Sequence, residues 1–199
     1  MTWQRRVISF ERLFDYNASG HWQTTESLKN DIRRFQSVRP AAGLSLDLID
    51  RIVEWKLRRQ RARTEKHRHA LTECVWRDVT ACAFSVKHDD PDLLASVQVN
   101  LLAALPGVGI GLASAILALT FPNDHGVLDF RVWKIIFGTD KKSFTAQDYV
   151  QYLHELRPFA KETGWSVQRA DFMVWSAYAE PTTPQHGRAE SGVPVRDER

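Results

Sequence analysis

Residues 101–138 read LLAALPGVGIGLASAILALTFPNDHGVLDFRVWKIIFG, and this stretch decides the fold that we predict for the chain. Apolar residues at helical spacing lie on both sides of a Pro-Gly-Val-Gly turn at residues 106–109. They are Leu102, Leu105, Ala113, Ile116 and Leu117. Glycine adopts positive φ readily, so this turn can reverse the chain tightly. The pattern predicts two apolar helices joined by a short hairpin over about residues 92–121.

The hairpin turn is also a candidate binding site, because it exposes backbone amides close to the start of its second helix. Such amides and the helix dipole together favour an anion such as phosphate. The pattern is typical of the helix-hairpin-helix module, which holds the DNA backbone without reading base sequence. The structural alternative is that the glycines only join two core helices.

Helical signals continue through the rest of the chain. Asp90 followed by Pro91 predicts a helix start, Thr145 predicts another, and Gly164 predicts a helix end. We expect a helix over residues 26–38, capped by Thr24 or Thr25, and another over residues 71–86. A long helix from Ser45 is expected to run on into residues 56–68.

No segment alternates like a β-strand, so the predicted fold class is all-α. Residues 1–180 are expected to form one helical domain. Residues 181–199 are rich in Pro, Thr, Gly, Ser and charged residues, which predicts a flexible tail.

The composition favours a soluble protein of one domain, or of two lobes that share a core. Hydrophobic residues make up 43% of the 199, and no apolar run approaches the ~20 residues that cross a bilayer. We therefore expect no membrane partner, no secretory signal and a cytoplasmic location. Cys74 and Cys82 would lie about 12 Å apart along one helix, too far for a disulfide, and are expected to be small core residues.

Positive charge is concentrated in one segment. The net charge is only +3, but residues 56–68, KLRRQRARTEKHR, contain a run of Lys and Arg with a single Glu. A block of this kind favours a polyanion partner, and nucleic acid is a better candidate than a membrane because the block lacks an apolar face. The alternative is a solvated helix face.

A lone carboxylate completes the central stretch. Asp129 comes 20 residues after Gly109, in the sequence Val-Leu-Asp, and Pro122 lies near the end of the intervening apolar helix. Over about residues 101–137 this arrangement resembles the helix-hairpin-helix superfamily of DNA glycosylases. The resemblance implies a two-lobed helical fold with an essential Asp at the mouth of the cleft between the lobes.

The resemblance also implies an activity. A DNA glycosylase flips a damaged or modified base out of the duplex, hydrolyses its N-glycosidic bond and leaves an abasic site. Asp129 would stabilise the positive charge that develops on the sugar and orient or deprotonate the attacking water, and it is also expected to cap the following helix. The biological setting would be base excision in DNA repair, or antiviral defence against phages that carry modified DNA.

One departure from the family pattern selects the subclass. Bifunctional members carry a lysine two residues after the last hairpin glycine, where this chain has Gly111. The resemblance therefore implies a monofunctional glycosylase, a hydrolase that uses water as the nucleophile. Lys56 or Lys134 could supply an amine from elsewhere, but nothing in the sequence requires it.

The expected partner is double-stranded DNA, bound by a monomer. No metal or organic cofactor is expected, and a monovalent cation at the hairpin turn is the one ion that the resemblance leaves open. The expected DNA-binding residues are Leu105, Gly107, Val108, Gly109, Gly111, Arg131, Lys134, Lys56 and Arg59. The base-pocket candidates are Trp55, Trp76 and His125, with Trp133 and Trp175 as further aromatics, although each tryptophan is also a natural core residue. The alternative functions are a non-catalytic helix-hairpin-helix DNA-binding protein and a helical protein-interaction domain.

Overall fold

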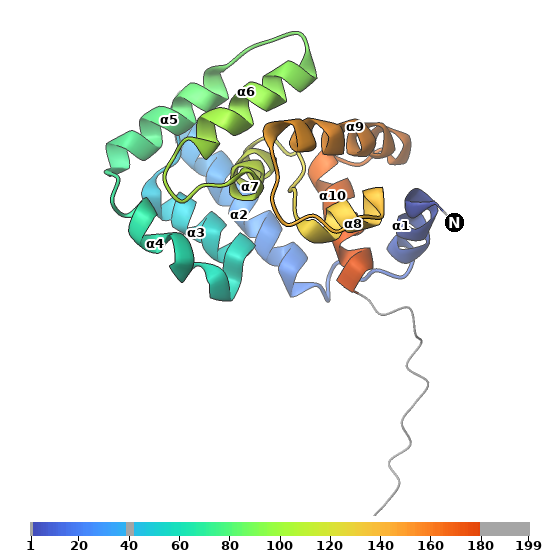
Figure 1. Ribbon diagram of the computed structural model, residues 1–199. Coiled ribbons are helices and arrows are strands. Elements are labelled where there is room, and N and C mark those ends of the chain that lie inside the picture. Colours follow the sequence, from blue (N-terminus) through green and yellow to red (C-terminus); the bar gives the residue numbers. More distant parts are fainter. Residues whose placement is uncertain (1, 39–41, 180–199) are drawn as a thin grey trace, which may run out of the picture.

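The computed structural model describes residues 2–38 and 42–179, and in that part of the chain all regular structure is helical (Figure 1). The all-α class is confirmed. The elements are α1 (Trp3–Glu11), α2 (Gly20–Val38), α3 (Leu46–Leu57), the 3₁₀ helix η1 (Arg58–Gln60), α4 (Ala62–Arg68), α5 (Glu73–Ser85), α6 (Pro91–Ala103), α7 (Ile110–Thr120), α8 (Phe130–Phe137), α9 (Ala146–Thr163) and α10 (Val167–Ala179). None of these helices has the length and apolar character needed to cross a lipid bilayer. The tail predicted at residues 181–199 lies outside the described residues.

Helix α7 is the centre of the molecule. Every residue from Leu112 to Thr120 is buried, because the helix is apolar on all sides and small at several positions. It contacts α2, α3, α6, α9 and α10. The second helix of the predicted hairpin is therefore the core around which the other elements pack.

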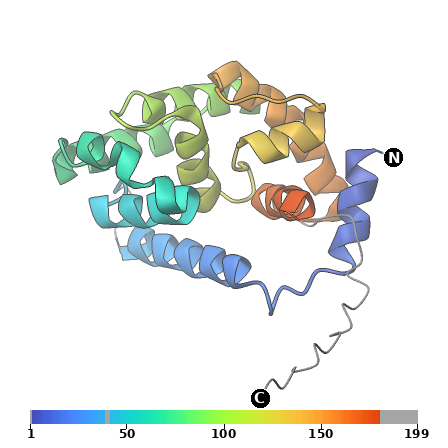
Figure 2. The same cartoon turned by 60° about the horizontal axis from the view of Figure 1, so that its bottom comes forward.

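The remaining helices pack in two groups on either side of α7 (Figure 2). Helices α2 and α3 pack together, as do α5 and α6, and α3 also contacts α5. In the other group α10 contacts α1, α8 and α9. Contacts between α6 and α9 join the groups.

The local signals in the sequence place most helix ends correctly. The Asp90 side chain caps α6 with Pro91 in the first turn, and Thr145 forms a capping box at the start of α9. Gly164 ends α9 in the left-handed conformation. Gly138 ends α8 in the same way. The caps at Asp90 and Thr145 and the helix end at Gly164 confirm predictions that depend only on neighbouring residues. The role of Gly138 was not predicted.

Two predicted helix boundaries were wrong. Helix α2 begins at Gly20, so Thr25 lies inside it and its hydroxyl donates to the His21 carbonyl instead of capping. The long helix from Ser45 stops at Leu57, because Arg58 has a φ of 47° and turns the chain away. The basic segment therefore continues as η1 and α4.

The cysteines are free, but the expectation that they lie in the core was wrong. Helix α5 packs inward through Trp76, Thr80 and Ala83. Cys74 lies two residues before Trp76 and Cys82 lies between Thr80 and Ala83, so both point away from that face and are exposed.

Candidate functional site

The predicted hairpin is formed by α6, a turn and α7. Leu105 and Val108 are buried, and the Val108 amide donates to the Leu105 carbonyl at 3.0 Å. Gly107 has a φ of 81°, the left-handed region that favours glycine, whereas Gly109 is extended and precedes the first residue of α7. The side chains of Leu105 and Val108 thus pack into the core beneath the turn. Only the backbone atoms of these two residues could reach a ligand.

The turn lies against the basic segment. A Cβ on Gly107 would come within 3.1 Å of the His67 Cβ and 3.2 Å of the Thr64 carbonyl, both on α4. Gly109 is exposed and faces open space. Within the described residues no hydrogen bond is made by the amides of residues 109–111. The free amides are therefore at the α7 end of the turn, beside a cationic segment.

Not every cation of that segment is available to a partner. Arg68 is buried and forms a salt bridge with Asp50, with Nη2 and Oδ1 2.9 Å apart. Arg61 pairs with Glu54 at 2.6 Å between Nη1 and Oε1. Part of the predicted basic patch therefore stabilises the fold, and the side chain of Arg59 lies outside what the structure describes.

A buried serine joins the hairpin to the loop that carries Asp129. The Ser114 hydroxyl donates to the Gly111 carbonyl and accepts from the Leu128 amide, both at 3.0 Å. A Cβ on Gly111 would lie 3.2 Å from the Leu128 carbonyl. The hairpin helix and the residue before Asp129 are thus in direct contact.

Asp129 uses its two carboxylate oxygens differently. Its Oδ1 caps α8 by accepting from the amides of Arg131 and Val132 at 2.8 and 3.1 Å. Its Oδ2 lies 3.8 Å from Nζ of Lys56, which also donates to the Leu128 carbonyl at 3.3 Å. Burial lowers the pKa of Lys56, and the Asp129 carboxylate opposes that effect.

The Leu128 carbonyl is therefore close both to Gly111 of the hairpin helix and to the Lys56 ammonium of α3. Lys56 was expected to bind DNA backbone. The structure places it beside Asp129, with its Nζ 3.8 Å from Oδ2.

Asp129 and Lys56 line a cavity of about 650 Å³. It lies between α2 and the α3–η1 segment on one side and α8 and α10 on the other. Its aromatic lining is His21, Trp55, Phe130, Phe172 and Trp175, and its charged lining is Lys56, Arg58, Asp129, Arg131 and Asp171. The volume and the aromatic walls suit a flat heterocyclic ring.

His21 and Trp55 form a stacked wall of this cavity. Their ring centroids are 5.5 Å apart and the planes differ by 9°. His21 also lies 4.9 Å from the Trp175 ring, and Arg58 Nη2 lies 3.2 Å from its Nδ1. Burial and the Arg58 charge lower the pKa of His21 to about 4, so this imidazole is neutral at pH 7.

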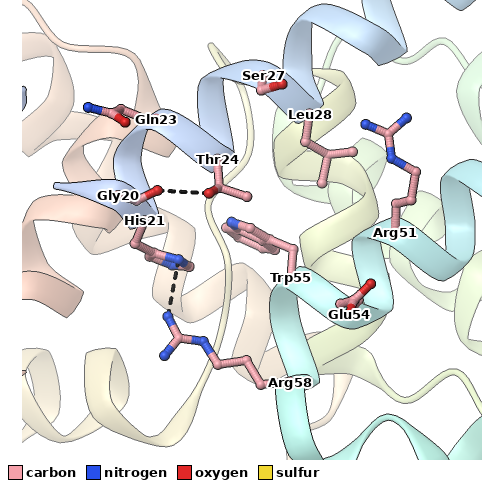
Figure 3. A pocket seen from close by; sticks show the side chains of 10 residues that line it. All are labelled: Gly20, His21, Gln23, Thr24, Ser27, Leu28, Arg51, Glu54, Trp55 and Arg58. Carbon is pink, nitrogen blue, oxygen red and sulfur yellow. Dashed lines mark hydrogen bonds between the residues drawn. The ribbon is translucent and has the colours of Figure 1, made fainter.

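Figure 3 shows His21, Trp55 and Arg58 from the neighbouring hollow, where His21 on α2 and Trp55 on α3 face each other. This hollow has a volume of about 720 Å³ and is more open to solvent than the Asp129 cavity. It lacks a carboxylate other than Glu54. The shared wall therefore separates a shallow outer hollow from the cavity that holds Asp129.

A second carboxyl group lines the Asp129 cavity. Asp171, on α10, is 4% exposed and accepts a hydrogen bond from the Tyr152 hydroxyl at 2.6 Å. Burial raises its pKa to about 7, and the nearby charge of Asp129 acts in the same direction. Gly126 allows this arrangement, because a Cβ there would lie 2.5 Å from the Tyr152 hydroxyl oxygen.

Two of the three base-pocket candidates are not in this cavity. Trp55 lines it, but Trp76 is fully buried in α5 and donates from Nε1 to the Arg68 carbonyl at 3.2 Å. His125 is 2% exposed, and its Nδ1 lies 3.0 Å from the Tyr149 hydroxyl. Both side chains are therefore part of the core, where Nε1 of Trp76 and Nδ1 of His125 have partners within the fold.

The remaining candidates divide in the same way. Trp175 lines the cavity, with the Arg131 guanidinium 5.5 Å from its ring centroid, whereas Trp133 is buried against Phe137. Lys134 points to the surface and pairs with Asp140 at 2.9 Å. Arg131 is thus the one cation of α8 that reaches the cavity.

Part of this site was not predicted from the sequence. The cavity residues Gln168, Asp171, Phe172 and Trp175 lie at helical spacing on one face of α10. Two polar residues on an otherwise apolar helix face were a usable signal. His21 carried no such signal, because only the fold brings it opposite Trp55.

Comparison of the chain with protein-family models, curated proteins and solved structures found no match. The functional argument therefore rests on the residues and geometry of the site.

Proposed function

We propose that this protein is a monofunctional DNA glycosylase, which hydrolyses the N-glycosidic bond of a flipped-out damaged or modified base. The observation that carries the proposal is the cavity of about 650 Å³ beside Asp129, with aromatic walls and one carboxylate oxygen not used in helix capping. A filled core at this point would have favoured a non-catalytic DNA-binding protein.

The proposed reaction uses the free oxygen of Asp129. As the bond from C1′ to the base breaks, the sugar becomes positively charged, and a fixed carboxylate stabilises that charge. The same oxygen can accept a proton from the water that attacks C1′. The Lys56 ammonium lies 3.8 Å from this oxygen and would help to hold it in position.

The flipped base would stack against the aromatic side chains that line the cavity. His21 packs against Trp55 of α3 and against Phe172 and Trp175 of α10, so these four rings form one continuous aromatic surface. Aromatic stacking replaces the stacking energy that the base loses when it leaves the duplex. A neutral His21 suits this role because it is not strongly hydrated.

The DNA backbone would lie across the hairpin and the basic segment. The amides at the start of α7 offer hydrogen bonds to a phosphate, and α4 lies next to the turn. The two groups of helices around α7 would correspond to the lobes of the family fold, with the Asp129 cavity between them. This proposal makes binding dependent on salt but not on sequence.

The proposal is tested with a panel of duplexes, each carrying one damaged or hypermodified base. Abasic sites are detected as strand breaks after alkali. The wild-type protein should release at least one base, and Asp129→Asn, which can still cap α8, should lose that release. Salt-dependent DNA binding with no release from any duplex would instead identify a non-catalytic DNA-binding protein.

The nucleophile needs a separate test, because Lys56 is close enough to Asp129 to compete with water. Borohydride reduction traps a protein–DNA adduct only when an amine has attacked C1′. We expect no adduct. An adduct that disappears in Lys56→Gln would overturn the water mechanism while leaving the glycosylase assignment intact.

A further inference from the structure

Asp171 is a buried acid in the proposed active site with no structural need for its charge. It forms no salt bridge within the described residues, and its partners are the Tyr152 hydroxyl and the Val127 amide. It lines the same cavity as Asp129. An uncharged amide such as Asn could accept both of these bonds, so the fold does not explain why an ionisable group lies here.

The charged and titratable groups near Asp171 belong to α3, α8, α9 and the residue that caps α8. Asp129 is that cap, Arg131 lies in the first turn of α8, and Lys56 belongs to α3. The hydroxyl of Tyr152 on α9 faces it directly. Together with burial, the negative charge of Asp129 holds the pKa of Asp171 at about 7, so about half of the Asp171 carboxyl groups are protonated in neutral solution.

We propose that Asp171 is the acid that protonates the leaving base, and that the substrates are therefore uncharged bases rather than cationic alkylated ones. The proposal rests on the glycosylase function proposed above. An uncharged base is a poor leaving group as an anion, and a proton on one of its ring nitrogens or exocyclic oxygens removes that barrier. A cationic alkylated base leaves as a neutral molecule and needs no acid.

The step balances without any further reactant. The electron pair of the bond between C1′ and the base nitrogen goes to the base, which takes its proton from Asp171. The attacking water gives its hydroxyl to C1′ and its proton to Asp129. After release, Asp129 loses its proton and Asp171 regains one from solvent.

The charge of the cavity independently disfavours a cationic base. Lys56, Arg58 and Arg131 line it, whereas its carboxyl groups are Asp129 and an Asp171 that is about half protonated at neutral pH. The Arg131 guanidinium already lies over the Trp175 ring, 5.5 Å from its centroid. A cation–π site that would attract a cationic base is thus occupied by the protein itself.

The test compares wild type, Asp171→Asn and Asp129→Asn on duplexes carrying hypoxanthine, 8-oxoguanine, 5-hydroxymethylcytosine or glucosylated 5-hydroxymethylcytosine, with 7-methylguanine as the cationic base. Wild type should release an uncharged base, and its rate should fall as the pH rises above about 7. Asp171→Asn should be roughly 10²- to 10⁴-fold slower, without that alkaline decline. Release of 7-methylguanine alone, or wild-type rates in Asp171→Asn, overturns the inference.

Tyr152→Phe separates a catalytic role from a structural one. Loss of the hydroxyl that donates to Asp171 favours the protonated carboxyl, so the alkaline decline should move to higher pH. Tyr149→Phe is the matched control, since its hydroxyl bonds to His125 and the Gly126 carbonyl instead. Equal shifts in both variants, or no shift in Tyr152→Phe, contradict the proposal.

A measurement without substrate distinguishes the two failures. In ¹³C-carboxyl NMR spectra, the aspartate resonance missing from Asp171→Asn should titrate near pH 7. Titration below pH 5 overturns the acid role even if bases are released. If Asp171 titrates near pH 7 but no base is released from any duplex, the glycosylase function is overturned, and with it the proposed role of Asp171 as its acid.

Discussion

Replacement of Ser114 by alanine should weaken the connection between the hairpin and Asp129. The hydroxyl accepts from the Leu128 amide and donates to the Gly111 carbonyl, both at 3.0 Å. Ser114 and Leu128 are each fully buried. In Ser114→Ala the Leu128 amide would stay buried without a partner.

The expected magnitude follows from that single lost acceptor. A buried donor without a partner costs about 1–3 kcal/mol. We therefore expect the free energy of unfolding to fall by about 2 kcal/mol, which lowers the melting temperature of a chain of this size by roughly 4–8 °C. The substitution removes only one hydroxyl group, so the cavity that it leaves adds little to the loss of stability.

Urea and thermal denaturation measure this change, with Ser85→Ala as the matched control. The Ser85 hydroxyl is exposed and donates only to the Cys82 carbonyl of its own helix, so its removal should change stability by less than about 0.5 kcal/mol. Equal stabilities for the two variants would refute the reasoning. Base release at a temperature well below both transitions provides a second readout, because a looser Leu128 displaces Asp129.

Three further predictions follow from burial and charge. Trp76→Ala should destabilise the fold by about 3–5 kcal/mol because its side chain is fully buried, whereas Trp55→Ala should lose less stability and more base release. Gly126→Ala should cost about 1–3 kcal/mol, because its Cβ would lie 2.5 Å from a tyrosine oxygen, whereas Gly20→Ala, with no atom within 4 Å, should be tolerated. The pKa of Asp171 is about 7 in the folded protein and about 3.9 in the unfolded chain. The free energy of unfolding of the wild type should therefore fall as the pH rises from about 4 to about 7. Asp171→Asn, which cannot ionise, should gain stability relative to wild type over the same window; equal pH dependence in denaturation would contradict this.

The helical architecture was predictable because its signals are local. Asp90, Thr145 and Gly164 each act on the residues of one turn, and the structure uses all three as predicted. At both wrongly predicted boundaries the residue has a partner far away in the sequence. Thr25 accepts from Trp55 Nε1, and Arg58 Nη2 lies 3.2 Å from His21 Nδ1.

The candidate site was predictable only in part. Asp129 was identifiable from its spacing to the hairpin, and its capping role is confirmed. Trp76 and His125 resembled Trp55 as candidates because an aromatic residue has the same sequence signature in a core and in a cavity wall. Which aromatic meets solvent depends on the packing of whole helices.

The order of residues along the chain was enough to predict the all-α class, a turn at residues 106–109 between two helices, and a carboxylate at the start of α8. Helical periodicity and capping depend on residues within a few positions of one another, so one chain is enough to read them. Only the tertiary structure brought Lys56 of α3 to Asp129 and placed Asp171 of α10 in the same cavity. Burial lowers the pKa of Lys56 and raises the pKa of Asp171. This burial arises only when helices far apart in the sequence pack together, so it could not be predicted from local patterns.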